Sequence, residues 1–153
     1  MSSKILIVDD HEIVRHGIRT ILNSSRPDWE ICGEAKNGQE AIDVVRESKP
    51  DLVILDISMP VMDGLEAARR ILKMRLDCRV LVFTMHESLG LISAVQASGA
   101  HGYVVKSQAA RDLIAAIDLL LAGGTFFGPQ AQLDASRANT DSRPGNSNGG
   151  QSL

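Results

Sequence analysis

One carboxylate, Asp56, stands where a run of apolar residues ends and a loop begins. The run covers residues 52–55 and is entirely aliphatic, and the loop after it contains Pro60 and Gly64. A carboxylate at the end of a buried strand can serve as a nucleophile that forms an aspartyl-phosphate, or as a ligand for a hard metal ion. Asp56 is therefore the first candidate for chemistry in this chain.

Other polar residues stand at the ends of similar apolar runs. They are Asp9, Asp10, Thr84 and Lys106. Each of them taken alone also fits a structural role, as a helix cap or a solvated surface group. Their common position favours a shared site, because parallel strands present their carboxyl ends at one edge of a sheet and ligands bind beyond that edge.

The residue types at this edge suit phosphoryl transfer. The carboxylates of Asp9, Asp10 and Asp56 are the hard oxygen ligands that Mg²⁺ prefers, and without a cation they would raise one another's pKa values. With Mg²⁺ bound, Asp56 would stay ionised and could attack a phosphorus atom. Lys106 would place a positive charge beside a phosphoryl oxygen, and the Thr84 hydroxyl would donate a hydrogen bond to it. The sequence thus predicts a Mg²⁺-dependent site that accepts a phosphoryl group.

Short apolar runs alternate regularly with amphipathic segments. We predict strands at residues 4–8, 30–33, 52–55, 79–83 and 102–105. Three of these runs are continuous in Ile, Val and Leu, which indicates strands covered on both faces. The segments between them show helical stripes, and Ser107 is the predicted N-cap of the last helix. Five βα units predict an α/β fold with a doubly wound parallel sheet.

Composition places the chain among ordinary globular proteins. Of its 153 residues, 44% are hydrophobic and 23% are charged. The net charge of −3 argues against generic binding to nucleic acid or to an anionic membrane. No apolar run approaches the ~18 residues of a membrane span, and no secretory signal opens the chain, so we expect a cytoplasmic location. Cys32 and Cys78 match no metal-binding spacing and are predicted to be buried apolar residues.

The end of the chain differs in character. Residues 131–153 are rich in Ser, Asn, Gly and Asp and show no apolar period. Such a segment buries too little apolar surface to offset the entropy of ordering it. We therefore predict one domain over residues 1–129 and a disordered polar tail over residues 130–153.

Five spaced blocks give the chain a specific resemblance to the response-regulator receiver domain of bacterial two-component signalling. The blocks read VDDH at 8–11, PDLVILD at 50–56, MPVMDG at 59–64, FTMH at 83–86 and GYVVK at 102–106. Several of them resemble the NarL/FixJ subfamily. The resemblance covers residues 4 to about 129 and implies a flavodoxin-like (βα)5 fold with strand order 2-1-3-4-5.

The resemblance also implies roles for the residues at the strand ends. Asp56 would be phosphorylated by a sensor histidine kinase, a phosphotransfer protein or a small phosphodonor. Asp10, Asp56 and the backbone carbonyl of Ser58 would bind Mg²⁺, and Asp9 would assist. Lys106 would hold the phosphoryl group. The site would therefore be a phosphoacceptor.

A switch would carry the signal away from this site. The resemblance implies that the Thr84 hydroxyl moves to the phosphoryl group while the ring of Tyr103 turns inward. Residues 88–98 lie nearby and contain no charged side chain, so we expect this segment to dock the kinase, a second copy of the chain in a homodimer, or a downstream protein target. Ser58 and His86, each two residues past a site residue, are expected to tune the lifetime of the phosphoryl group.

Two alternative functions stay open. NarL/FixJ-type regulators usually continue into a LuxR-type helix-turn-helix, for which residues 131–153 offer no apolar stripes and no basic cluster. We therefore expect a stand-alone receiver without direct nucleic-acid binding; the alternative is the receiver fragment of a DNA-binding transcriptional regulator. The other alternative is an aspartyl-nucleophile phosphatase. Such enzymes usually carry a second aspartate where this chain has Ser58, so we predict a switch with at most self-phosphorylation and self-dephosphorylation, and not an enzyme.

Overall fold

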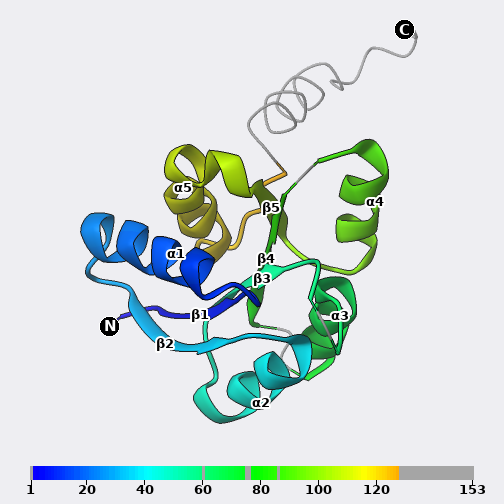
Figure 1. The fold of residues 1–153 in the computed structure, drawn as a ribbon, viewed down its shortest axis with the longest axis horizontal. Coiled ribbons are helices and arrows are strands. Elements are labelled where there is room, and N and C mark those ends of the chain that lie inside the picture. Colours follow the sequence, from blue (N-terminus) through cyan, green and yellow to red (C-terminus); the bar gives the residue numbers. More distant parts are fainter. Residues whose placement is uncertain (1, 60, 75–76, 86, 128–153) are drawn as a thin grey trace, which may run out of the picture.

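The computed structural model describes residues 2–59, 61–74, 77–85 and 87–127. Strands and helices alternate along the chain, as the sequence predicts (Figure 1). The strands are β1 (Lys4–Val8), β2 (Glu30–Ala35), β3 (Leu52–Asp56), β4 (Arg79–Thr84) and β5 (Gly102–Val105). The helices are α1 (Glu12–Ser25), α2 (Gly38–Ser48), α3 (Gly64–Met74), α4 (Leu89–Ala97), the 3-10 turn η1 (Lys106–Gln108) and α5 (Ala109–Leu121).

The strands form one five-stranded parallel sheet in the order β2-β1-β3-β4-β5. This order confirms the flavodoxin-like arrangement. The order reverses between β1 and β3, and ligands of doubly wound sheets bind beyond the carboxyl ends of the strands at such a point. Two strands run one residue past their apolar runs, so that Asp56 and Thr84 are the last residues of β3 and β4. Backbone pairing continues there because it does not depend on the polarity of the side chain.

Helices cover both faces of the sheet. Successive side chains of a strand point to opposite faces, and in β1 the pair Ile5 and Ile7 faces one hydrophobic cluster while Leu6 and Val8 face another. The first cluster includes buried residues of α1 and α5, and the second includes those of α2, α3 and α4. Figure 1 shows the same division, with α1 and α5 on one side of the sheet. The strands are therefore held rigidly from both sides.

One helix begins at a side-chain cap, whereas the cap predicted for another helix is wrong. Asn37 caps α2, because its side-chain oxygen accepts a hydrogen bond of 2.9 Å from the backbone N–H of Glu40. Ser107 does not cap α5. It lies inside η1, and Gln108 holds the cap position without a side-chain hydrogen bond. The chain leaves β5 in a tight 3-10 turn, so α5 begins later than the sequence suggests.

After α5 the chain returns to the edge of β5. Gly102 bridges to Phe126, and the Tyr103 N–H donates a hydrogen bond of 2.8 Å to the Phe126 carbonyl. The predicted domain boundary at 129 and the predicted tail, 130–153, lie outside the described residues. Among the helices that the structure describes, none combines the length and the apolar character needed to cross a membrane.

Candidate functional site

Two buried carboxylates meet at the carboxyl ends of the central strands. Asp56 ends β3, and Asp9 directly follows β1, whose last residue pairs with Leu55. Both carboxylates are almost completely buried, whereas Asp10 beside them is partly exposed. The structure therefore brings the predicted acidic residues together at the point where the strand order reverses.

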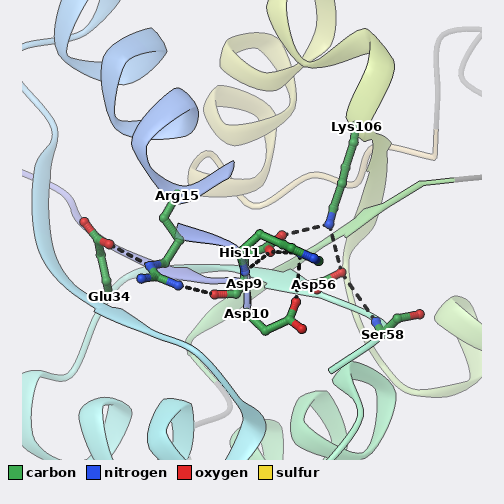
Figure 2. Close-up of polar contacts among 8 residues, drawn as sticks. All are labelled: Asp9, Asp10, His11, Arg15, Glu34, Asp56, Ser58 and Lys106. Carbon is green, nitrogen blue, oxygen red and sulfur yellow. Dashed lines mark hydrogen bonds and ion pairs between the residues drawn. The ribbon is translucent and has the colours of Figure 1, made fainter. Parts of the chain in front are cut away.

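Lys106 joins the two buried carboxylates (Figure 2). Its ammonium nitrogen lies 2.8 Å from Asp9 Oδ2 and 3.2 Å from Asp56 Oδ1. Burial lowers the pKa of Lys106, but the hydrogen bond to Asp9 and the charge of Asp56 outweigh it, so that the pKa lies above its usual value. Lys106 is thus a cation held against both acids at neutral pH.

The environment of Asp56 disfavours its negative charge. Burial raises the pKa of Asp56, and the neighbouring charge of Asp9 raises it further. Lys106 and the backbone N–H of Ser58, 3.4 Å from Asp56 Oδ1, act in the opposite direction without cancelling the shift. An added cation at this place would favour the ionised form of Asp56.

The acidic loop after β1 offers such a cation a place. Asp9, Asp10 and His11 hold ligand atoms within 4.8 Å of one another. Asp10 Oδ1 is buried and accepts no hydrogen bond from the residues that the structure describes, and its close polar neighbour is His11 Nδ1 at 3.1 Å. An acceptor oxygen without a donor, grouped with the carboxylate of Asp9, fits Mg²⁺. His11 was not a predicted ligand; its position directly after the acidic pair was the available signal.

The two predicted switch residues lie on neighbouring strands. Thr84 is buried at the end of β4, one residue past the strand partner of Asp56. Tyr103 on β5 is also buried, and its hydroxyl donates a hydrogen bond of 2.7 Å to Glu87 Oε1. Its ring centroid lies 6.3 Å from that of Phe127. Burial and the Glu87 carboxylate both raise the pKa of Tyr103, so this hydroxyl stays protonated.

The two predicted tuning residues have different outcomes. Ser58 is exposed and lies next to Asp56, to which its N–H points. This position is compatible with an influence on approaching water, and the tuning role stays a prediction. His86 lies outside the described residues.

The site also includes a polar network that the sequence did not predict. Arg15 on α1 contacts both the backbone of Asp9 and the side chain of Glu34 on β2 (Figure 2). No spacing along the chain reveals this contact, because the two side chains are 19 positions apart and meet only when α1 folds onto the sheet.

The fold and the site together define a class: a doubly wound sheet with an acidic, lysine-bridged site at its switch point. The chain belongs to the response regulator receiver domain family, whose family model matches residues 5–118. It is thus a receiver domain of two-component response regulators. Members of this family are in general phosphoacceptor switches that interact with kinases and downstream effectors, and not classical enzymes.

Known relatives and solved structures agree with this assignment. The transcriptional regulatory protein DegU of Brevibacillus brevis is 33% identical over 83% of this chain and 53% of its own length. The response regulator GacA of Pseudomonas syringae pv. syringae is 36% identical, over 83% of this chain and 59% of its own length. The chain therefore spans a little over half of these two relatives.

The crystal structure of a two-component response regulator of the LuxR family, from Aurantimonas sp., matches with a TM-score of 0.80 and 35% identity. That match covers 92% of this chain and 99% of the other. The isolated REC domain of RcsB from Salmonella enterica, solved with the phosphomimetic BeF3−, matches with a TM-score of 0.77 and 28% identity over 84% of this chain and 95% of its own.

Proposed function

We propose that this protein is a phosphoacceptor switch that becomes phosphorylated on Asp56 in a Mg²⁺-dependent reaction. The observation that carries the proposal is the position of Lys106, whose ammonium group lies within 3.2 Å of both Asp56 and Asp9. A half-buried lysine between two carboxylates supplies a fixed positive charge where a phosphoryl group bound to Asp56 would place its oxygens.

The acidic residues would hold the metal ion. Asp10, Asp56 and the backbone carbonyl of Ser58 would be ligands of Mg²⁺, and Asp9 would assist. When bound, Mg²⁺ supplies positive charge that favours the ionised carboxylate and neutralises the transferring group. The raised pKa of Asp56 supports this assignment, because a site that disfavours its own anion gains by binding a cation.

The transfer itself needs one nucleophile. A carboxylate oxygen of Asp56 forms a bond to phosphorus while the bond from phosphorus to the donor breaks, and the donor leaves with that electron pair. The donor would be the phosphohistidine of a sensor kinase or of a phosphotransfer protein, or a small acyl phosphate. Lys106 then moves its contact from the carboxylate to a phosphoryl oxygen, and the Thr84 hydroxyl donates a hydrogen bond to another. The later loss of the phosphoryl group to water would be tuned by Ser58 and His86.

The output would pass through β4, β5 and α4. A Thr84 hydroxyl drawn toward the phosphoryl group changes the space beside Tyr103, whose hydroxyl is tied to Glu87 just before α4. Phosphorylation would thus bias a two-state element that includes the start of α4.

The surface of α4 supports a docking role. The helix carries no charged side chain, and Leu89 at its start is 85% exposed, with Met85 also exposed nearby. We propose that the segment 88–98 docks a protein: the kinase, a second phosphorylated copy of the chain, or a target.

Replacing Leu89 by Glu should abolish phosphorylation-dependent association, and Ser93→Glu on the same helix should have a milder effect. Unaltered association of the Leu89 variant would refute this role.

A second candidate for the whole protein has specific support. DegU is named a transcriptional regulatory protein, and this chain spans 53% of its length. The chain would then be the receiver part of a DNA-binding regulator and not a stand-alone receiver with a disordered tail. The mass of the native gene product distinguishes the two, because these 153 residues account for 16.5 kDa. Either product would act in the cytoplasm, where the phosphodonors are.

The direct test is chemical. The protein is incubated with Mg²⁺ and a small acyl phosphate, and its intact mass is measured. We expect a gain of one phosphoryl group, lost in Asp56→Asn and kept in Asp43→Asn, which changes an exposed aspartate on α2. Loss in both variants, or in neither, would count against Asp56 as the acceptor.

A further inference from the structure

A charged network lies behind the acidic pair, on the side away from Lys106 (Figure 2). Arg15, on the first turns of α1, donates a hydrogen bond of 2.6 Å from Nη1 to the backbone carbonyl of Asp9. Its Nε donates a second one of 2.8 Å to Glu34 Oε1 on β2. Arg19, one turn further along α1, donates from Nε to the other Glu34 oxygen at 3.0 Å.

The Asp9 carbonyl needs this partner. Asp9 is completely buried, and its N–H already pairs with the Ala35 carbonyl at 3.0 Å. Its carbonyl lies past the end of β1 and before the start of α1, and no backbone N–H of the described residues donates to it. A buried backbone carbonyl without a donor is costly, and Arg15 supplies the donor.

The guanidinium group is itself held in place. The Arg15 side chain is only 15% exposed, and its planar group reaches Asp9 and Glu34 with two different nitrogens. The hydrogen bond from Arg19 is the largest cause of a lowered pKa at Glu34, and the Arg15 hydrogen bond adds to it against the effect of burial. Glu34 is therefore a carboxylate at neutral pH that fixes the orientation of Arg15.

We propose that Arg15, oriented by Glu34, is a positioning residue for the cation site. By fixing the Asp9 carbonyl, it sets the course of the loop that carries Asp9 and Asp10, and with it the direction of both carboxylates. The inference rests on the proposed function, because the cation is the one that this function requires. Groups that orient metal ligands commonly change metal affinity by about 10- to 100-fold when removed.

Charge alone predicts the opposite effect. Arg15 is a cation close to a cation site, so its removal should strengthen the binding of Mg²⁺ if the charge were what mattered. A purely structural role would lower thermal stability and leave the Mg²⁺ affinity of the folded protein unchanged. Positioning predicts weaker binding despite the more favourable charge, and the sign of the change therefore separates the explanations.

Arg19 is the matched control. It lies on the same helix, carries the same charge and pairs with the same Glu34, but the structure shows no contact with the Asp9 backbone. Arg19→Ala thus removes an equal charge and an ion pair with the same carboxylate without releasing the loop. Arg15→Lys keeps the charge but replaces the planar fork by a single-point donor, so it should fall between the wild type and Arg15→Ala.

The experiment is titration of the full chain with Mg²⁺ by calorimetry, on protein shown to be folded by its circular dichroism and melting temperature. We expect Arg15→Ala to bind Mg²⁺ about 10-fold more weakly or worse and Arg19→Ala to stay within about 2-fold of the wild type. If Arg15→Ala does not fold, the folded Arg15→Lys variant replaces it in the comparison and should bind Mg²⁺ several-fold more weakly than the wild type. Unchanged or tighter binding by the Arg15 variants would overturn the inference and leave the proposed function standing. A wild type that binds no Mg²⁺ would overturn both.

Discussion

The hydroxyl of Tyr103 donates a hydrogen bond of 2.7 Å to the carboxylate of Glu87. The bond joins β5 to the segment just before α4, and the Tyr103 side chain that donates it is buried. If either residue moves, the hydrogen bond must break or the other residue must move with it.

This bond should be measurable as a coupling free energy. Hydrogen bonds to charged groups contribute about 1.5–3 kcal/mol, so we expect Tyr103→Phe and Glu87→Ala each to destabilise the fold by about 1–2 kcal/mol. In the double variant the two losses should not add, and the cycle should give a coupling of about 1–2 kcal/mol. Urea unfolding of the four proteins measures it. Additive losses would mean that the bond contributes nothing to stability.

A strained residue stands in the loop after Asp56. Val61 has φ of 72°, in the left-handed region that β-branched residues rarely adopt, and its side chain is 81% exposed. Because the exposed side chain has little packing to lose, Val61→Gly should stabilise the fold by about 1 kcal/mol. Val61→Ala keeps a Cβ at the same φ and should recover less. A midpoint of urea unfolding that falls in the glycine variant would contradict this prediction.

Two glycines should respond to alanine in opposite directions. A Cβ on Gly64 would lie 2.1 Å from the Asp56 carbonyl oxygen, so Gly64→Ala must move the backbone of the site and should cost about 2–4 kcal/mol. A Cβ on Gly17 would meet nothing within 4 Å in the middle of α1. Gly17→Ala should therefore stabilise the fold by about 0.5–1 kcal/mol. Thermal unfolding of the two variants compares them directly, and a similar shift in both would refute the steric account.

His101 should make stability depend on pH. Its Nδ1 accepts a hydrogen bond of 3.0 Å from the Val80 N–H, which requires the neutral ring. Burial, and secondly the charge of Arg79, lower the pKa of His101 to about 4. As the pH falls below about 6.5, the unfolded chain binds a proton that the folded chain does not, so stability is lost toward pH 4.

The loss from this residue should be roughly 1–2 kcal/mol, allowing for partial exposure. This loss of stability reaches its full size only near pH 4 and is absent above pH ~7. Urea unfolding at pH 7 and at pH 5 checks it against His101→Gln, which keeps an acceptor but does not titrate. The two proteins should differ less at pH 5 than at pH 7; an equal difference at both would exclude the histidine as the cause.

The sheet and the centre of the site could be predicted because both depend on local sequence. Aliphatic runs mark buried strands, and a polar residue at the end of each run marks the edge where ligands bind. Asp56 and Lys106 could be placed together on this ground alone, and the structure confirms that they meet.

The remaining contacts depend on where helices settle on the sheet. Arg15 meets Glu34 across α1 and β2, and Tyr103 meets Glu87 across β5 and the segment before α4, at separations that no period reveals. The cap predicted at Ser107 was wrong for a related reason, since the 3-10 turn after β5 has no signature in the apolar pattern.

The central claim is that Asp56 accepts a phosphoryl group with the help of Mg²⁺. The most direct measurement is the mass of the peptide that contains Asp56, taken after incubation with a small acyl phosphate in the presence of Mg²⁺ or of a chelator. We predict one added phosphoryl group on this peptide with Mg²⁺ and almost none with the chelator. A phosphoryl group on a different peptide, or equal labelling without Mg²⁺, would contradict the claim.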